Sequence, residues 1–141
     1  MGTQIFIKTA IVACLVAGLT ASSLARPKKM KYIPDGAWGA QHISVQVEKG
    51  SARIEYDCAH GTITGPLKLD SKGRFSVLGT HVREHGGPTR QGEDQQGIPA
   101  RYTGWTDGKR MTLTVTLVGS KESLGTYTLT HGQLGRIFKC A

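Results

Sequence analysis

The stretch 101–118, RYTGWTDGKRMTLTVTLV, constrains the fold most, because two alternating runs flank the pair Asp107-Gly108. An Asp-Gly pair in this position is typical of a two-residue type I′ hairpin turn, in which both central residues need positive φ. The predicted register places Trp105 opposite Arg110 and Tyr102 opposite Leu113. Side chains alternate between the two faces of a strand, so one face of this hairpin is apolar and the other polar. The apolar face holds Tyr102, Gly104, Met111, Leu113, Val115 and Leu117.

A second hairpin is predicted from residues 42–48 and 51–59, which flank the pair Lys49-Gly50. Its register places Val45 opposite Ile54 and brings every apolar side chain to one face. On the polar face His42 lies opposite Asp57. We interpret this pair as an exposed cross-strand ion pair, with a catalytic dyad as the alternative.

Further strands are predicted over 62–69, 74–83, 125–130 and 134–140. Residues 84–99 are a long polar connection, and no window after the N-terminal segment has helical periodicity. About eight strands joined mostly by tight turns favour an all-β fold, an antiparallel up-and-down barrel. A β-sandwich with the same strands is the alternative.

The N-terminal segment has the features of a signal peptide. Lys8 precedes a short apolar run, and Ser23-Leu24-Ala25 carries small residues where a signal peptidase cleaves, so we predict residues 1–25 to be removed. The loss of Lys8 lowers the formal net charge of the 141-residue chain from +8 to +7. Residues 26–35 are predicted as a flexible basic leader that is either a solubilising linker or an arm for an anionic surface, and 36–141 as the barrel domain.

Two cysteines, Cys58 and Cys140, remain after cleavage. An even pair in an exported chain predicts a disulfide and a secreted or periplasmic location, with two buried free thiols as the alternative. Closing so long a loop stabilises by about 4 kcal/mol in the chain-entropy model. No transmembrane segment is predicted in the mature chain.

An up-and-down path alternates its turns between two ends of the barrel, and this predicts a mouth rich in histidine. Strand 74–83 places His81 and Arg83 in the phase of Phe75, unless a bulge at Gly79 reverses it. The mouth is predicted to bind an anionic small molecule, to bind a transition metal, or to be exposed polar surface. The candidate ligand-binding residues are His60, His81, Arg83, His85 and Trp38.

The sequence contains no catalytic constellation, and the chain is predicted not to be an enzyme. No cofactor is predicted, no metal site is assigned beyond the alternative named for the mouth, and no nucleic acid is expected as a partner. The favoured function is an exported binding protein whose ligand is a small molecule or an anionic surface. The alternative is a protein-binding module, such as a periplasmic inhibitor of an exported hydrolase, that acts through the basic leader.

Gly36-Ala37-Trp38 before the first predicted strand resembles the G-x-W opening of the avidin and lipocalin barrels. The T-D-Y motif of lipocalins and the biotin contacts of avidins are not met. The stretches 55–61, EYDCAHG, and 79–88, GTHVREHGGP, resemble an uncharacterised family of small secreted bacterial proteins. This resemblance implies an exported bacterial protein and brings no activity. The layout is also similar to that of small periplasmic metalloprotease inhibitors.

Overall fold

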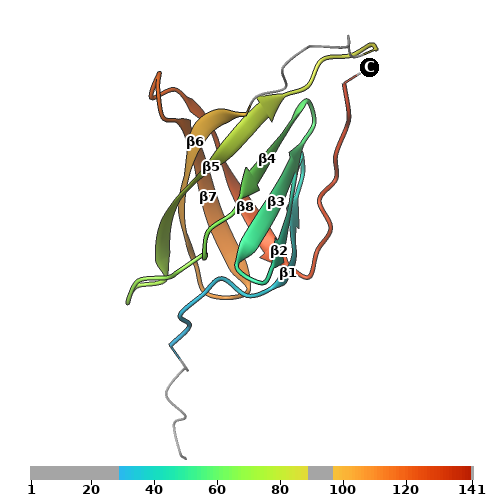
Figure 1. The fold of residues 1–141 in the computed structure, drawn as a ribbon. Helices are drawn as coiled ribbons and strands as arrows, with labels where there is room; N and C mark the ends of the chain where they lie inside the picture. The colour runs from blue at the N-terminus through green and yellow to red at the C-terminus, as the bar shows by residue number, and fades with distance from the viewer. Residues whose placement is uncertain (1–28, 89–96, 141) are drawn as a thin grey trace, which may run out of the picture.

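The computed structural model describes residues 29–88 and 97–140, and these form an all-β domain without helices (Figure 1). Each strand pairs antiparallel with the next, and the last pairs with the first, so the predicted closed barrel of eight strands is confirmed. The strands are β1 (Gly36–Ala40), β2 (Ile43–Glu48), β3 (Ser51–Tyr56), β4 (Ala59–Ile63), β5 (Arg74–Arg83), β6 (Ile98–Thr106), β7 (Arg110–Leu117) and β8 (Ser123–His131). The predicted signal peptide lies outside the described residues.

The hairpin of β2 and β3 has the predicted register, with Val45 opposite Ile54. Lys49 and Gly50 both have positive φ, as a two-residue turn of the primed type requires. The alternation of buried and exposed residues along both strands follows from this register. The inner face of this hairpin therefore forms one wall of the core.

The register predicted for the hairpin of β6 and β7 is wrong by two residues. Trp105 lies opposite Thr112 rather than Arg110, and Tyr102 lies opposite Val115. The turn is wider because the Asp107 carboxylate accepts hydrogen bonds from the amides of Lys109 and Arg110, and only Gly108 takes a positive φ. A shift of two residues keeps every side chain on its face, so the predicted apolar face is still the buried one.

The strands at the two ends of the chain differ from the prediction. Residues 36–40 form β1, which turns into β2 through Gln41 and His42, and His42 takes the positive φ that this tight turn needs. Residues 134–140 form no strand. The predicted strand 62–69 is instead the shorter β4, because the chain turns at Asp57 and Cys58 and leaves the sheet after Ile63.

Residues 132–140, here called the C-terminal strap, run along the outside of the barrel from one end to the other (Figure 1). The strap crosses the turn between β1 and β2, where the Arg136 amide donates to Ala40 O and the His42 amide donates to Arg136 O. A Cβ atom at Gly39 would lie 2.4 Å from the backbone nitrogen of Gly135. Only glycine allows the strap to approach β1 so closely.

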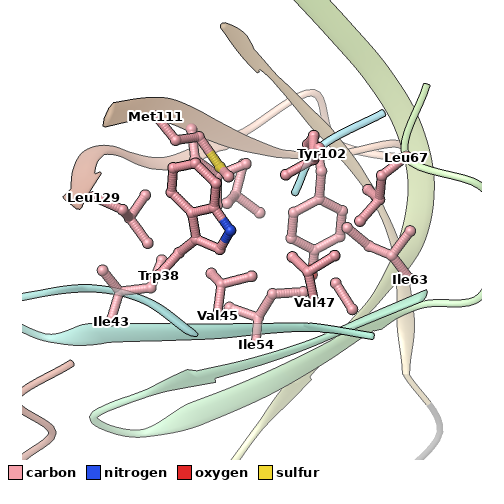
Figure 2. Packing of buried hydrophobic residues seen from close by; sticks show 14 of the residues in the cluster. Trp38, Ile43, Val45, Val47, Ile54, Ile63, Leu67, Tyr102, Met111 and Leu129 are labelled. Atoms are coloured by element: carbon pink, nitrogen blue, oxygen red, sulfur yellow. The ribbon is translucent and has the colours of Figure 1, made fainter. Parts of the chain in front are cut away.

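Buried aliphatic side chains, among them Val47, Ile54 and Leu129, surround two large rings in the barrel interior, where Trp38 and Tyr102 are fully buried (Figure 2). The Tyr102 hydroxyl donates a hydrogen bond of 2.7 Å to Thr80 O. It fits because Gly61 lacks a side chain, since a Cβ there would lie 2.2 Å from the hydroxyl oxygen. The interior is therefore filled by side chains at this level.

One end of the barrel is closed by residues 29–35 together with the connection 64–73, and we call it the closed end. The Ile33 amide donates to Leu67 O and the Leu69 amide to Lys31 O, and both Ile33 and Leu67 are buried. The Trp38 indole donates to Pro34 O at 3.0 Å. The described part of the predicted leader, residues 29–35, thus packs as part of the domain. None of the described residues forms a helix with the length and apolarity that crossing a membrane requires.

The predicted disulfide between Cys58 and Cys140 is confirmed and joins positions 82 residues apart. It fixes the end of the strap to the turn between β3 and β4. Replacing both cysteines by serine should lower the free energy of unfolding by about 4 kcal/mol, because the unfolded chain regains the freedom of a long loop. Urea unfolding of the oxidised protein and the double variant measures this difference. A loss below about 1 kcal/mol would contradict it.

Gly39→Ala should lower the free energy of unfolding by about 1–3 kcal/mol, because the new methyl group meets the strap backbone, which has no room to yield. Gly119→Ala is the matched control, since a Cβ there meets nothing within 4 Å. Urea unfolding of both variants provides the comparison. Equal stability of the two would show that the strap is not held against β1.

Candidate functional site

The end of the barrel opposite the closed end carries the turns 41–42 and 57–58 and the connections that follow β5 and β7. We call it the mouth. The strand that enters it, β5, keeps one phase throughout, since its register with β6 runs without interruption from Arg74 to His81. The alternative of a bulge at Gly79 is therefore wrong. Phe75 and His81 are both buried on the inner side, as the unbroken alternation predicts.

A cavity of about 390 Å³ opens at the mouth. Its volume is within the range of small-molecule pockets. Its walls come from β3, β4, β5 and β8, from the turns 41–42 and 57–58 and from Glu84 after β5, and they bring aromatic and aliphatic side chains together with charged groups. The lining residues are His42, Tyr56, Asp57, Cys58, Ala59, His81, Arg83, Glu84, Leu124 and Tyr127.

Three rings pack together in this cavity. The ring centroid of Tyr56 lies 5.3 Å from that of His81 and 5.9 Å from that of Tyr127, and both pairs are tilted. Tyr56 and His81 are each only 6% exposed, and within the described residues the buried Tyr56 hydroxyl and His81 Nδ1 have no hydrogen bond of good geometry, although the Tyr56 hydroxyl lies near that of Tyr102. Buried polar atoms are nearly always paired, so two such atoms on neighbouring rings mark a place for a polar ligand group.

Burial lowers the pKa of the His81 imidazole below its ordinary value of about 6.5, and the charges of Arg83 and His60 act in the same direction. His81 is therefore neutral at pH 7 and presents one donor and one acceptor nitrogen. Burial also raises the pKa of the Tyr56 hydroxyl, which stays protonated and can donate. The inner wall of the cavity thus offers neutral hydrogen-bonding groups.

Asp57 holds one side of the rim together. Its carboxylate accepts a hydrogen bond of 2.8 Å from the Phe138 amide and one of 2.5 Å from His42 Nδ1. These bonds, the Phe138 amide first, lower the pKa of Asp57 below its ordinary value. The predicted pair of His42 and Asp57 is confirmed, and its role includes fastening the strap to the rim.

Glu84 holds the other side of the rim. It accepts a hydrogen bond of 2.8 Å from His60 Nδ1 and one of 3.0 Å from Lys139 Nζ, and the bond from His60 is the main reason that the pKa of Glu84 is lowered. Lys139 also donates to Glu55 at 2.9 Å. Most charged groups of the rim are therefore paired with each other.

Arg83 differs from these groups. Its side chain is exposed and lines the cavity, and in the described parts of the chain no carboxylate lies within ion-pair distance of it. A guanidinium without a protein counter-ion at the edge of a pocket is suited to a carboxylate or phosphate of a ligand. It supplies the positive charge of the site.

The five residues predicted as ligand-binding lie in different places. His81 and Arg83 line the cavity, whereas His60 lies beside it on the outer face of β4, bonded to Glu84. His85 follows β5 at the same end and is exposed. Trp38 lies in the middle of β1 and is buried in the core. The cavity brings in Tyr56 and Tyr127, which the sequence analysis did not include. Tyr56 alternates in step with Ile54 on the inner face of β3, and Tyr127 with Leu129 on the inner face of β8. This alternation could have identified both tyrosines from the sequence.

The histidines do not form a metal centre. Within residues 29–88 and 97–140, no three histidine, cysteine, aspartate or glutamate side chains converge as metal ligands do. His60 uses its Nδ1 on Glu84, while His81 faces the opposite side of the sheet. The cavity therefore offers hydrogen bonds and one cation rather than a coordination set.

The chain was compared with known protein families, curated proteins and solved structures. No protein-family model matches the chain, and searches of curated proteins and of solved structures found no significant match. The site is therefore interpreted from its own geometry.

The lowered pKa of His81 predicts a pH dependence of stability. As the pH falls below about 6.5, His81 binds a proton in the unfolded chain but stays neutral in the folded protein. The free energy of unfolding should therefore decrease until the pH reaches the lowered pKa of the folded state. His81→Phe should flatten this part of the profile relative to the native protein. Urea unfolding between about pH 7 and 5 measures the slopes. An unchanged slope in His81→Phe would contradict the assignment.

Proposed function

We propose that this chain is an exported binding protein that holds a small anionic molecule in the cavity at its mouth. The observation that carries the proposal is a cavity of about 390 Å³ that is lined by Arg83, Tyr56 and His81, where Tyr56 Oη and His81 Nδ1 are buried without a hydrogen bond of good geometry among the described residues. Such atoms are costly to leave unpaired, and a ligand with a polar group removes that cost. The disulfide supports the exported location, since disulfides persist in oxidising compartments.

The lining defines the chemistry of the ligand. Tyr56, Tyr127 and Leu124 form an apolar wall that suits a flat aromatic or conjugated body. His81 and the Tyr56 hydroxyl suit a carbonyl or hydroxyl group on that body. Arg83 suits a carboxylate, sulfonate or phosphate at its outer end. The ligand class is therefore an aromatic acid with an additional hydrogen-bonding group.

Binding is favoured over catalysis by the state of the groups near the cavity. The His42 and Asp57 pair resembles the base half of a catalytic triad, in which a histidine activates a nucleophile. The thiol beside it, Cys58, is held in the disulfide, and the carboxylate is occupied by the Phe138 amide. The pair thus has a structural task.

The fluorescent aromatic sulfonate 1-anilinonaphthalene-8-sulfonate tests the proposal as a probe of this class. Arg83→Gln should weaken its binding about tenfold or more, because a charge-assisted hydrogen bond is lost. Arg101→Gln removes an equal charge from the outer face of β6 and should leave the affinity unchanged. Fluorescence titration and calorimetry measure the dissociation constants.

A second variant separates the inner wall from the rim. His81→Phe keeps an apolar ring but removes the hydrogen-bonding nitrogen, and it should also weaken the probe while circular dichroism shows the native fold. Equal affinities of the native protein, Arg83→Gln and His81→Phe would show that the probe binds elsewhere and would contradict the proposal.

A further inference from the structure

The closed end of the barrel concentrates positive charge. Its turns and the segment 29–35 carry six exposed lysines, and two arginines follow at the first residues of β5 and β7. The lysines are Lys29, Lys31, Lys49, Lys68, Lys72 and Lys109. They come from four separate segments, which the fold brings to one end. The described part of the mouth carries charges of both signs instead, since Asp57, Glu84 and Glu122 lie among the basic residues Arg83, Lys121, Arg136 and Lys139.

Four acidic residues, Asp35, Glu48, Asp70 and Asp107, also lie at the closed end, so the six lysines and two arginines leave an excess of four positive charges there. Asp70 binds the Arg74 guanidinium at 2.8 Å and accepts from the amides of Lys72 and Arg74. Asp107 accepts from the amides of Lys109 and Arg110. Among the described residues, no ion pair involves any of the six lysines. Their charge is therefore directed to the surroundings.

Two amphipathic aromatic side chains are exposed at the same end. Trp105 is 42% exposed and lies against Gly73, where a Cβ would come within 3.2 Å of its indole nitrogen. Tyr32 is 54% exposed and belongs to the segment that pairs with residues 67–69. Trp105 also borders a hollow of about 560 Å³ with Lys29, Met30 and Lys72. Tryptophan and tyrosine among lysines are typical of surfaces that rest at a lipid headgroup layer.

We propose that the closed end docks on an anionic lipid bilayer. The lysines are spread over the turns at the end of the barrel, so a broad charged surface can meet many of them together. Lysine is a point charge that suits diffuse attraction, whereas planar recognition of a single phosphate uses arginine. Arg74 is bound to Asp70, so six lysines stand beside a single arginine, Arg110, that has no ion pair among the described residues. Trp105 and Tyr32 add contacts with the headgroup region that a charge-only surface lacks.

Vesicle binding tests the proposal with the purified protein. It should bind vesicles of equimolar phosphatidylglycerol and phosphatidylcholine, and this binding should disappear at about 1 M salt, where charges are screened beyond about 3 Å. Each basic residue near an anionic bilayer contributes about fivefold in affinity, so Lys29→Gln, Lys72→Gln and Lys109→Gln together should weaken binding about a hundredfold. Sedimentation with the vesicles gives the partition constants.

The control removes the same charge from other surfaces. Arg53→Gln, Arg101→Gln and Lys121→Gln together change the net charge equally but lie on β3, on β6 and at the mouth, and they should leave the affinity within about twofold. Bromine-labelled lipids should quench Trp105, and Trp105→Phe should lose the quenching because Trp38 is buried. Equal loss in both triple variants, equal binding to pure phosphatidylcholine, or tighter binding to a single-stranded oligonucleotide at equal phosphate concentration would overturn the proposal.

Discussion

The closure of the barrel between β1 and β8 is the constraint on which the rest of the structure depends. This ladder pairs only Trp38 with His131 and Gly39 with Thr130, and it is the shortest in the sheet. It is reinforced from both sides. Inside, the Trp38 ring is fully buried and lies 4.6 Å from the ring of His131. Outside, the strap lies over Gly39 so closely that no other residue fits there. A short seam is therefore held by packing on both of its faces.

The strap also connects this seam to the mouth. It leaves β8 at the closed end, crosses the turn of β1 and β2, and reaches the rim, where Asp57 binds the Phe138 amide and Cys58 binds Cys140. The residues that line the cavity at the rim are thus the same ones that fasten the end of the chain. This arrangement explains why the rim is rich in charged groups but leaves few of them free, with Arg83 as the cavity-lining cation that has no counter-ion in the described residues.

Much of the fold followed from alternation in the sequence, because burial fixes the phase of a strand over its whole length. The inner faces of β2, β3, β5 and β7 were predicted, and so was the disulfide. The residues at which the strands begin and end were not predicted. Phe138 and Cys140 alternate as in a strand, yet β1 already holds the place beside β8, so these residues lie outside. The Asp107 carboxylate likewise widened a turn whose sequence predicted a tighter one. The site was predicted in part: His81 and Arg83 came from the phase of β5, but Tyr56 and Tyr127 look like ordinary core residues until the depth of the cavity is known.

An even number of antiparallel strands has a practical consequence for this barrel. The first and last strands have their free ends on the same side, so a chain that continues after β8 starts at the closed end, and only the strap carries it to the rim (Figure 1). A reporter or affinity tag fused after the last residue would begin next to the cavity and compete for its entrance. The same tag fused ahead of the segment 29–35 would emerge beside the lysines and leave the entrance open. The choice of fusion site therefore decides which of the two surfaces remains accessible to an immobilised protein.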